Sequence, residues 1–406
     1  MENEIKWLTR RESLKVIGAT AGFLAMGFPF RLNAQEPIRL GTLCPLTGAG
    51  GPYGSQMEKA ISLVVKEIND LGGIHGQQIQ LFHEDSQTNP EAAVRAAHKL
   101  IEVNKVIAIM GHWASAVTLA VAPICYNNKV FDISVSGADA ISDLKDDDYI
   151  FRTQPSTLIQ VEANSRFTLE KGWKRIAYMA VQTPYAKTFG DIYKKRVEAG
   201  GATVVEYLIY EANKPSYRSE LTKVLASKPE HIMLLGYTPD MIVIFKELFR
   251  MGYNGGILGP GFAINQKLVD NVGAEVAEGI YILDPGTDPQ SPAYKNLVRL
   301  MGTTGVDSYT AQTYDHINLV ALSLWAGKVY TGTGIRDHLR TISNPPGIEV
   351  GSFQEGMKLL KEGKKINYQG ASGACDFDEK GDILSRPFSY SQVKSGKIVS
   401  IGWIKG

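Results

Sequence analysis

Short apolar segments alternate with amphipathic segments near the N-terminus, and this order constrains the fold more than any other feature. The run IRLGTLC at 38–44 fits a strand, and residues 55–70 carry apolar side chains at helical spacing. The pair recurs as QIQLFHED (78–85) followed by a helical segment at 89–102, and VIAIMG (106–111) is apolar throughout. A continuous apolar run is typical of a parallel strand covered on both faces. The order predicts a parallel sheet wound with helices.

A second series of the same kind begins after FRTQPS at 151–156. Its predicted strands are 175–181, 203–210, 231–237, 256–261 and 279–285, and its predicted helices are 189–200, 219–228 and 239–253. Two such series predict an α/β fold with two doubly wound lobes. Ligands bind at the carboxyl ends of strands in such sheets, so two facing edges would form a central cleft.

Length and charge narrow the classes of function. With 406 residues, 44% of them hydrophobic, the chain is long enough for two domains with full cores. A formal net charge of +1 gives no electrostatic signal for nucleic acid. The three cysteines, Cys44, Cys125 and Cys375, allow at most one disulfide, and we expect them to be buried and reduced. Small molecules and other proteins are the expected partners.

Residues 1–34 have the composition of an export signal. Arg10 and Arg11 precede a mildly apolar stretch at 16–30, which ends near small residues at Ala34. That stretch is shorter than the roughly 20 residues that span a bilayer. T-R-R-E-S-L-K resembles a twin-arginine signal. The alternative is a basic N-terminus on a buried helix. The first interpretation predicts removal of 1–34 and an exported, soluble protein.

The loop after the first strand has the glycine content of a nucleotide-binding turn. Gly48, Gly50 and Gly54 give G-x-G-x-x-x-G, which is close to the dinucleotide fingerprint G-x-G-x-x-G. Pro52 removes a backbone donor where a pyrophosphate needs one. The acidic pair at 84–85 ends the next strand, where a ribose ligand would be expected. A nicotinamide-dependent dehydrogenase therefore stays open as an alternative.

Other catalytic and metal-binding motifs are missing from the sequence. It contains no P-loop, no H-E-x-x-H, no paired C-x-x-C and no G-x-S-x-G. DFDEKGD at 376–382 resembles a calcium loop but lacks the closing glutamate, so a turn is the better interpretation. The absence of these motifs counts against common hydrolases and P-loop enzymes, and we expect no metal site.

Two serine-containing segments follow predicted strands directly. They are GHWASAVTLAVAPI (111–124), with Ser115, and DISVSGADAIS (132–142), with Ser136. The N–H groups that open the following helices, together with these hydroxyls, would hold a carboxylate. Helix capping by the same serines is the alternative. Because both segments end neighbouring strand units, they would converge on one cleft.

These segments and several others together resemble one family. They are IRLGTLCPLTGAGGPYGSQMEKAISLVVKEINDLGGIHGQQIQL, NPEAAVRAAHKLI, IAIMGHWASAVTLAVAPI, YIFRTQPS, GATVVEYLIY, GYTPDMIVIFKEL and DFDEKGD. In this order they resemble the periplasmic leucine/isoleucine/valine-type (branched-chain amino-acid) solute-binding proteins of ABC importers. The resemblance covers nearly all of the chain after residue 35.

The resemblance implies a type I periplasmic binding protein fold, with two lobes joined by three crossings that close on a ligand. The implied N-terminal lobe is 37–154 plus 284–330, and the implied C-terminal lobe is 155–283 plus 331–406. It also implies a periplasmic monomer without catalysis, cofactor or nucleic-acid partner, which delivers a small molecule to an inner-membrane ABC permease. A ligand-sensing module for a signalling partner is a further alternative.

The resemblance also assigns site positions. Ser115 occupies the position at which the family has a hydroxyl that binds the carboxylate of the ligand. Ser136 and Ala138 occupy positions at which backbone and hydroxyl groups complete that carboxylate site. Aromatic residues are expected over the pocket from both lobes: Tyr53 from the first, and Tyr185 and Tyr237 from the second.

Three positions depart from the family pattern. The amino-acid binders carry an acid after the Gly-Pro of the second lobe, where this chain has Gly261. A buried ammonium without a partner would cost several kcal/mol. Ala138 replaces a hydroxyl residue, and Trp113 adds a large flat surface, which serves either lobe packing or ring stacking. Both a small amino acid and a hydrophobic or aromatic carboxylate are therefore retained as ligand classes, with amides and urea also in the family.

Overall fold

The computed structural model describes residues 36–404, so the predicted export signal at 1–34 lies outside the described residues. Its first sheet has five parallel strands in the order β2-β1-β3-β4-β5. The strands are β1 (Ile38–Cys44), β2 (Ile79–Asp85), β3 (Ala108–His112), β4 (Phe131–Ser134) and β5 (Ile150–Arg152). The connecting helices are α2 (Gly51–Asp70), α3 (Pro90–His98) with a π-helical turn at Lys99–Val103, α4 (Ser115–Asn127) and a 3-10 turn at Asp139–Ile141.

The second sheet has seven strands in the order β15-β14-β10-β9-β8-β6-β7. The strands are β6 (Arg175–Val181), β7 (Thr203–Tyr210), β8 (His231–Leu235), β9 (Gly256–Gly259), β10 (Tyr281–Pro285), β14 (Phe388–Lys394) and β15 (Lys397–Ile404). The helices are α5 (Thr157–Glu170), α6 (Pro184–Ala199), α7 (Arg218–Ala226), α8 (Thr238–Arg250), α9 (Gln266–Val272) and α10 (Ala274–Ala277). β14 pairs antiparallel with β10 and with β15, while the inner strands are parallel. We call this sheet and its helices the second lobe.

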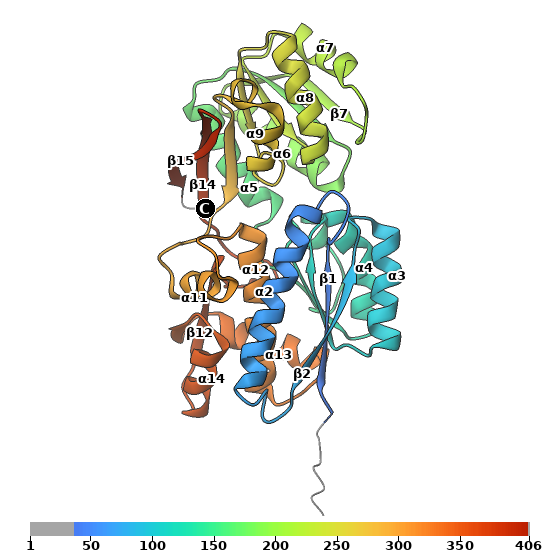
Figure 1. Cartoon of the computed structure of the whole chain (residues 1–406), viewed down its shortest axis with the longest axis vertical. Coiled ribbons are helices and arrows are strands. Elements are labelled where there is room, and N and C mark those ends of the chain that lie inside the picture. The colour runs from blue at the N-terminus through green and yellow to red at the C-terminus, as the bar shows by residue number, and fades with distance from the viewer. Residues whose placement is uncertain (1–35, 405–406) are drawn as a thin grey trace, which may run out of the picture. The chain divides into compact units, whose positions relative to one another are not determined.

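The chain returns to the first sheet between β10 and β14. The returning elements are α11 (Pro292–Met301), α12 (Ser308–Gly327), α13 (Gly332–Ser343), β11 (Ile348–Val350), α14 (Phe353–Lys361), β12 (Ile366–Gly370) and β13 (Gly373–Ala374). In Figure 1 they lie beside α2, and with the first sheet and its helices they form what we call the first lobe. The predicted α/β fold with two doubly wound lobes is confirmed.

One predicted boundary is wrong. The family resemblance implies that all of 331–406 belongs to the C-terminal lobe, but α13 and β12 pack in the core of the first lobe. Ile335 and Ile366 belong to the same buried cluster as Leu40 of β1. The segment returns to the second lobe only at β14. Apolar spacing along α13 predicts a helix with one buried face, but it does not show which sheet that face covers.

Several helices begin earlier than predicted, because a capping residue and a proline open them. α2 begins at Gly51, with Pro52 in its first turn, and not at residue 55. Thr183 accepts a hydrogen bond from the Ala186 N–H and so caps α6 ahead of Pro184. A proline in the first turn loses no helical hydrogen bond and is pre-set in φ.

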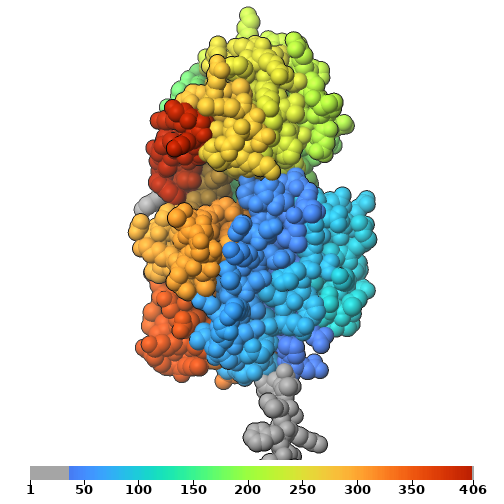
Figure 2. Space-filling model, in the orientation of Figure 1, coloured from blue at the N-terminus to red at the C-terminus, as the bar shows by residue number. Residues whose placement is uncertain are grey.

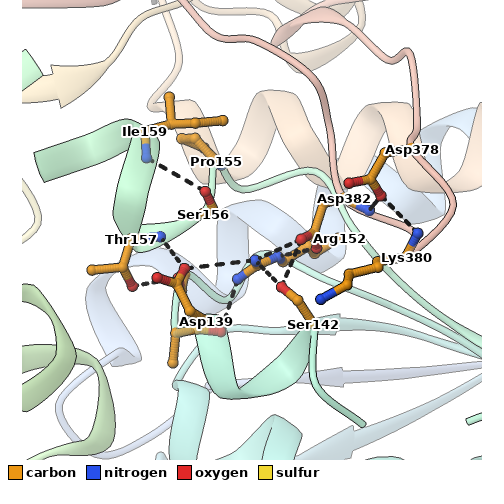
Figure 3. A network of polar contacts seen from close by, with 12 residues as sticks. Asp139, Ser142, Arg152, Pro155, Ser156, Thr157, Ile159, Asp378, Lys380 and Asp382 are labelled. Atoms are coloured by element: carbon orange, nitrogen blue, oxygen red, sulfur yellow. Dashed lines mark hydrogen bonds and ion pairs between the residues drawn. The ribbon is translucent and has the colours of Figure 1, made fainter. Parts of the chain in front are cut away.

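A polar network fixes the first crossing between the lobes (Figure 3). Arg152 ends β5 and is fully buried; its Nε donates to Asp382 Oδ1 at 2.5 Å, and its Nη2 donates to Asp382 Oδ2 at 3.0 Å. The same guanidinium donates to Ser142 Oγ at 2.6 Å and to the Ala138 carbonyl at 2.9 Å. Asp139 Oδ1 accepts from the Thr157 N–H at 2.8 Å. The network therefore ties the start of α5 and the 376–382 turn to the loop after β4.

Two further expectations concern the described residues. All three cysteines are free and buried, as predicted. No helix within 36–404 is both long and apolar enough to cross a membrane.

Candidate functional site

A cavity of about 60 Å³ lies where the carboxyl ends of the two sheets face each other. Its wall combines loop residues that follow β3, β4 and β5 with residues that follow β6 and β8. The lining residues are Trp113, Ala114, Ser115, Ala116, Val135, Gly137, Gln154, Val181, Thr183, Tyr185, Ala186, Leu235, Gly236, Tyr237, Phe262 and Tyr309. Of the predicted site residues, the structure places Ser115, Trp113, Tyr185 and Tyr237 on this wall.

Ser115 is the first residue of α4, and its hydroxyl is held in place. Ser115 Oγ accepts a hydrogen bond from the Ala138 N–H at 3.1 Å, so its own proton is free to donate. The backbone N–H groups of Ser115, Ala116 and Gly137 donate to no acceptor within residues 36–404. All three residues line the cavity. A helix N-terminus with free N–H groups favours an anion. The first lobe thus presents several donors to one end of the cavity.

Ser136 and Ala138 do not line the cavity. Ser136 is fully buried, and its hydroxyl is shared with Thr118 Oγ1 at 2.7 Å and the Trp113 carbonyl at 3.1 Å. The structure thus places this hydroxyl away from the cavity wall, and its contact with a ligand stays a prediction. The Ala138 N–H donates its hydrogen bond to Ser115 Oγ and so positions the Ser115 hydroxyl.

Trp113 is the centre of an aromatic cluster that joins the lobes. Its ring is stacked on Tyr53 at a centroid distance of 6.0 Å and tilted against Tyr237 at 5.8 Å. The rings of Phe262 and Tyr309 are each in T-shaped contact with the Trp113 ring, at centroid distances of 5.8 Å. Because Tyr237 and Phe262 come from the second lobe, Trp113 packs the lobes together and also walls the cavity.

Tyr53 and Gly261 lie outside the cavity, in an adjoining groove of about 520 Å³. Tyr53 Oη donates to the Phe262 carbonyl at 3.0 Å and accepts from Asn265 Nδ2 at 3.1 Å. Figure 2 shows the blue surface of the first lobe meeting the yellow surface of the second lobe. Tyr53 stacks on Trp113 and is hydrogen-bonded to the second lobe, so it connects the two lobes beside the cavity.

The other lining residues were not predicted from the sequence, among them Gly137, Gln154, Phe262 and Tyr309. Gln154 Oε1 accepts from Gln312 Nε2 at 2.8 Å, which leaves the Gln154 amide N–H groups as donors at the cavity. A Cβ on Gly137 would lie 2.7 Å from Gln160 Nε2, so a side chain there would have to displace the Gln160 amide. Gln154 could have been predicted from its position shortly after β5, because Ser115 and Ser136 likewise follow the ends of β3 and β4.

Asp284, near the end of β10, is a carboxylate in a space beside this cavity, and it was not predicted from the sequence. Its Oδ1 accepts from the Gly261 N–H at 2.8 Å. Burial raises the pKa of Asp284 to about 6, the Gly261 hydrogen bond lowers it, and the Asp307 charge raises it. Burial also raises the pKa of Tyr185 and Tyr309, and the charge of Asp284 adds to both shifts.

The glycine-rich loop is not shaped as a phosphate cradle. A Cβ atom built on Gly48 would lie 2.2 Å from the Gln87 carbonyl oxygen, and one built on Gly54 would lie 2.1 Å from the Pro45 carbonyl oxygen. Both distances are clashes, so the backbone of this loop already packs against neighbouring backbone. A Cβ on Gly50 would lie 2.7 Å from the Trp113 ring. The glycines permit close packing of this loop against the first lobe. Among the described residues, no group of three or more metal-ligating side chains could hold a metal ion.

Comparisons with known proteins agree with this architecture. A family model described as periplasmic binding protein matches residues 37–397. A Leu/Ile/Val-binding protein of Rhizobium johnstonii is 24% identical over 395 residues, which cover 96% of this chain and 99% of that protein. A leucine-, isoleucine-, valine-, threonine- and alanine-binding protein of Pseudomonas aeruginosa is 22% identical and is matched over 93% of its length by 91% of this chain.

Solved structures share the fold. A leucine-binding protein from Thermotoga maritima superposes with a TM-score of 0.78 at 21% identity, covering 90% of this chain and 98% of that one. A solute-binding protein from R. palustris in complex with benzoate gives a TM-score of 0.75 at 19% identity, covering 90% and 96%. At these identities the likeness establishes the fold alone.

Proposed function

The chain belongs to the periplasmic binding protein family, and on that premise we propose that it is the solute receptor of an ABC importer, binding a small amino acid or a hydrophobic or aromatic carboxylate. Ligand binding between the two lobes would close the cleft. The exported receptor would deliver its solute, as a periplasmic monomer, to an inner-membrane permease. We infer no catalysis and no cofactor.

One observation carries the proposal: donors from the first lobe converge on one end of a cavity whose other walls are apolar and aromatic. Ser115 O–H, the N–H groups of Ala116 and Gly137, and the Gln154 amide suit a carboxylate. Val181, Leu235 and the rings around Trp113 suit an apolar body. A few polar groups that fix orientation within apolar walls are typical of small-molecule sites.

The relatives support both ligand classes. The curated relatives are named for leucine, isoleucine and valine, and one structural relative was solved with benzoate. The cavity of about 60 Å³ is smaller than the roughly 150 Å³ cavity that holds benzene in an engineered protein. We therefore infer that the lobes move apart to admit a ligand of either class.

A thermal-shift panel tests the proposal. Dialysed protein is heated with leucine, phenylacetate, benzoate, simple amides and urea. We expect a saturable rise in melting temperature with at least one amino acid or carboxylate, because a ligand that binds only the folded state stabilises it. NAD(H) binding by fluorescence, with no shift from amino or aromatic acids, would favour the dehydrogenase alternative and overturn the proposal.

A further inference from the structure

Gly261 and Asp284 form one arrangement across neighbouring strands of the second lobe. β9 and β10 are parallel and paired, and Gly261 follows β9 while Asp284 lies near the end of β10. A Cβ built on Gly261 would lie 1.7 Å from Asp284 Oδ2. The carboxylate therefore occupies the space that any side chain at position 261 would need. A glycine at 261 is the condition for this carboxylate to sit there.

The carboxylate is incompletely paired. Asp284 Oδ1 accepts from the Gly261 N–H, whereas Oδ2 has no hydrogen-bond donor within residues 36–404. No lysine, arginine or histidine of the described residues forms an ion pair with it. Its charged neighbour is a second acid, Asp307, which raises its pKa further. Asp284 is half-buried, and a partly desolvated carboxylate in such surroundings is stabilised by an added cation or N–H donor.

Asp284 is also next to the cavity. It lines a narrow space of about 10 Å³ together with Gln154, Tyr185, Leu235, Phe262 and Tyr309. All five of those residues also line the main cavity, so the two spaces share one wall. The donor end belongs to the first lobe and the carboxylate belongs to the second. A ligand with opposite charges at its ends would pair with both and bridge the lobes.

We propose that Asp284 is a specificity-determining residue that binds a cationic amine of the solute, so that this receptor takes an amine-bearing carboxylate in preference to a simple carboxylate. The inference rests on the proposed function and deepens it. The acid that is missing at position 261 is supplied from the next strand.

Matched ligand pairs test the inference. Leucine is compared with 4-methylpentanoate, and phenylalanine with 3-phenylpropanoate, by isothermal titration of dialysed protein. Each pair differs by the amine alone. We expect the wild-type protein to bind at least one amino acid roughly tenfold or more tightly than its amine-free partner, the range for a hydrogen bond between charged groups.

Two variants locate the effect. Asp284→Asn keeps an acceptor for the Gly261 N–H but removes the charge, and we expect it to abolish the preference for the amine. Asp288→Asn, the same change at an exposed position four residues on, is the control and should retain the preference. If Asp284→Asn does not fold, Gly261→Ala provides the second route, because its Cβ would displace the carboxylate.

The outcomes separate the two claims. An unchanged preference in Asp284→Asn, or wild-type protein that binds the amine-free acids as tightly, overturns the role of Asp284 and leaves the solute-receptor function standing. Binding of benzoate or phenylacetate with no binding of either amino acid also overturns the role alone. If no amino acid or carboxylate binds, the proposed function fails, and the inference fails with it.

Discussion

Replacing Ser115 by alanine should weaken ligand binding and the fold by separate, predictable amounts. The Ser115 hydroxyl makes one contact inside the protein, with the Ala138 N–H at 3.1 Å, and its free proton points to a second partner in the cavity. Losing a hydrogen bond to a charged ligand group costs about 1.5–3 kcal/mol, which is roughly a 10- to 150-fold rise in the dissociation constant.

The same change leaves the Ala138 N–H without its partner in a fully buried backbone segment. An unpaired buried donor costs about 1–3 kcal/mol of folding free energy. Urea unfolding of the ligand-free protein measures this cost, and isothermal titration measures the loss of affinity. The two losses are distinct, because the first is present without ligand.

Ser136→Ala is the matched control. Its hydroxyl is hydrogen-bonded to Thr118 and to the Trp113 carbonyl and lies away from the cavity. We expect it to lose a similar amount of stability while its dissociation constant stays within about twofold of wild type. If Ser115→Ala loses stability but keeps its affinity, Ser115 is a structural residue and the carboxylate end is misplaced. If Ser136→Ala loses affinity instead, its hydroxyl is the ligand group.

Three further predictions follow from other parts of the structure. The pKa of Asp284 is raised from 3.8 to about 6, so the ligand-free protein should lose stability as pH rises from about 4 to about 6, by at most about 3 kcal/mol at about 1.4 kcal/mol per pH unit. Urea unfolding at pH 5 and pH 8 should show the upper part of this loss, about 1.4 kcal/mol, in the wild type and not in Asp284→Asn. Arg152→Met removes one partner of a buried ion pair and should cost about 3–5 kcal/mol; a loss below 1 kcal/mol by urea unfolding would contradict that role. Trp113→Ala removes the ring between the lobes, and small-angle scattering of the ligand-free variant should give a larger radius of gyration than wild type; an equal radius would show that Trp113 does not hold the lobes together.

Local pattern was sufficient to predict most of the parallel strands of the two sheets, but not the antiparallel strands β14 and β15. IRLGTLC and VIAIMG mark β1 and β3 because strands buried on both faces are continuously apolar, and the helices between them carry apolar residues at helical spacing. Pattern was insufficient for the segment after α12. The apolar face of α13 covers the first lobe, and that choice depends on which sheet the chain returns to, a long-range property with no local signal.

The site was predicted in part. Ser115 was found because a hydroxyl that opens a helix after a parallel strand is a recognisable arrangement. Ser136 looked equivalent in sequence, yet its side chain is turned into the first lobe, where its hydroxyl is hydrogen-bonded to Thr118 and to the Trp113 carbonyl. Asp284 could not be found from residue spacing, because its relation to Gly261 exists only through the pairing of β9 and β10.

The most direct test of the account is a crystal structure of the protein with the ligand that gives the largest thermal shift. We expect the ligand to lie between the lobes, with its carboxylate within hydrogen-bond distance of Ser115 Oγ and the Gly137 N–H. An amine, if the ligand has one, should lie against Asp284 Oδ2. A ligand bound at the 48–54 loop, or one in the adjoining groove with no contact to Ser115, would contradict the account.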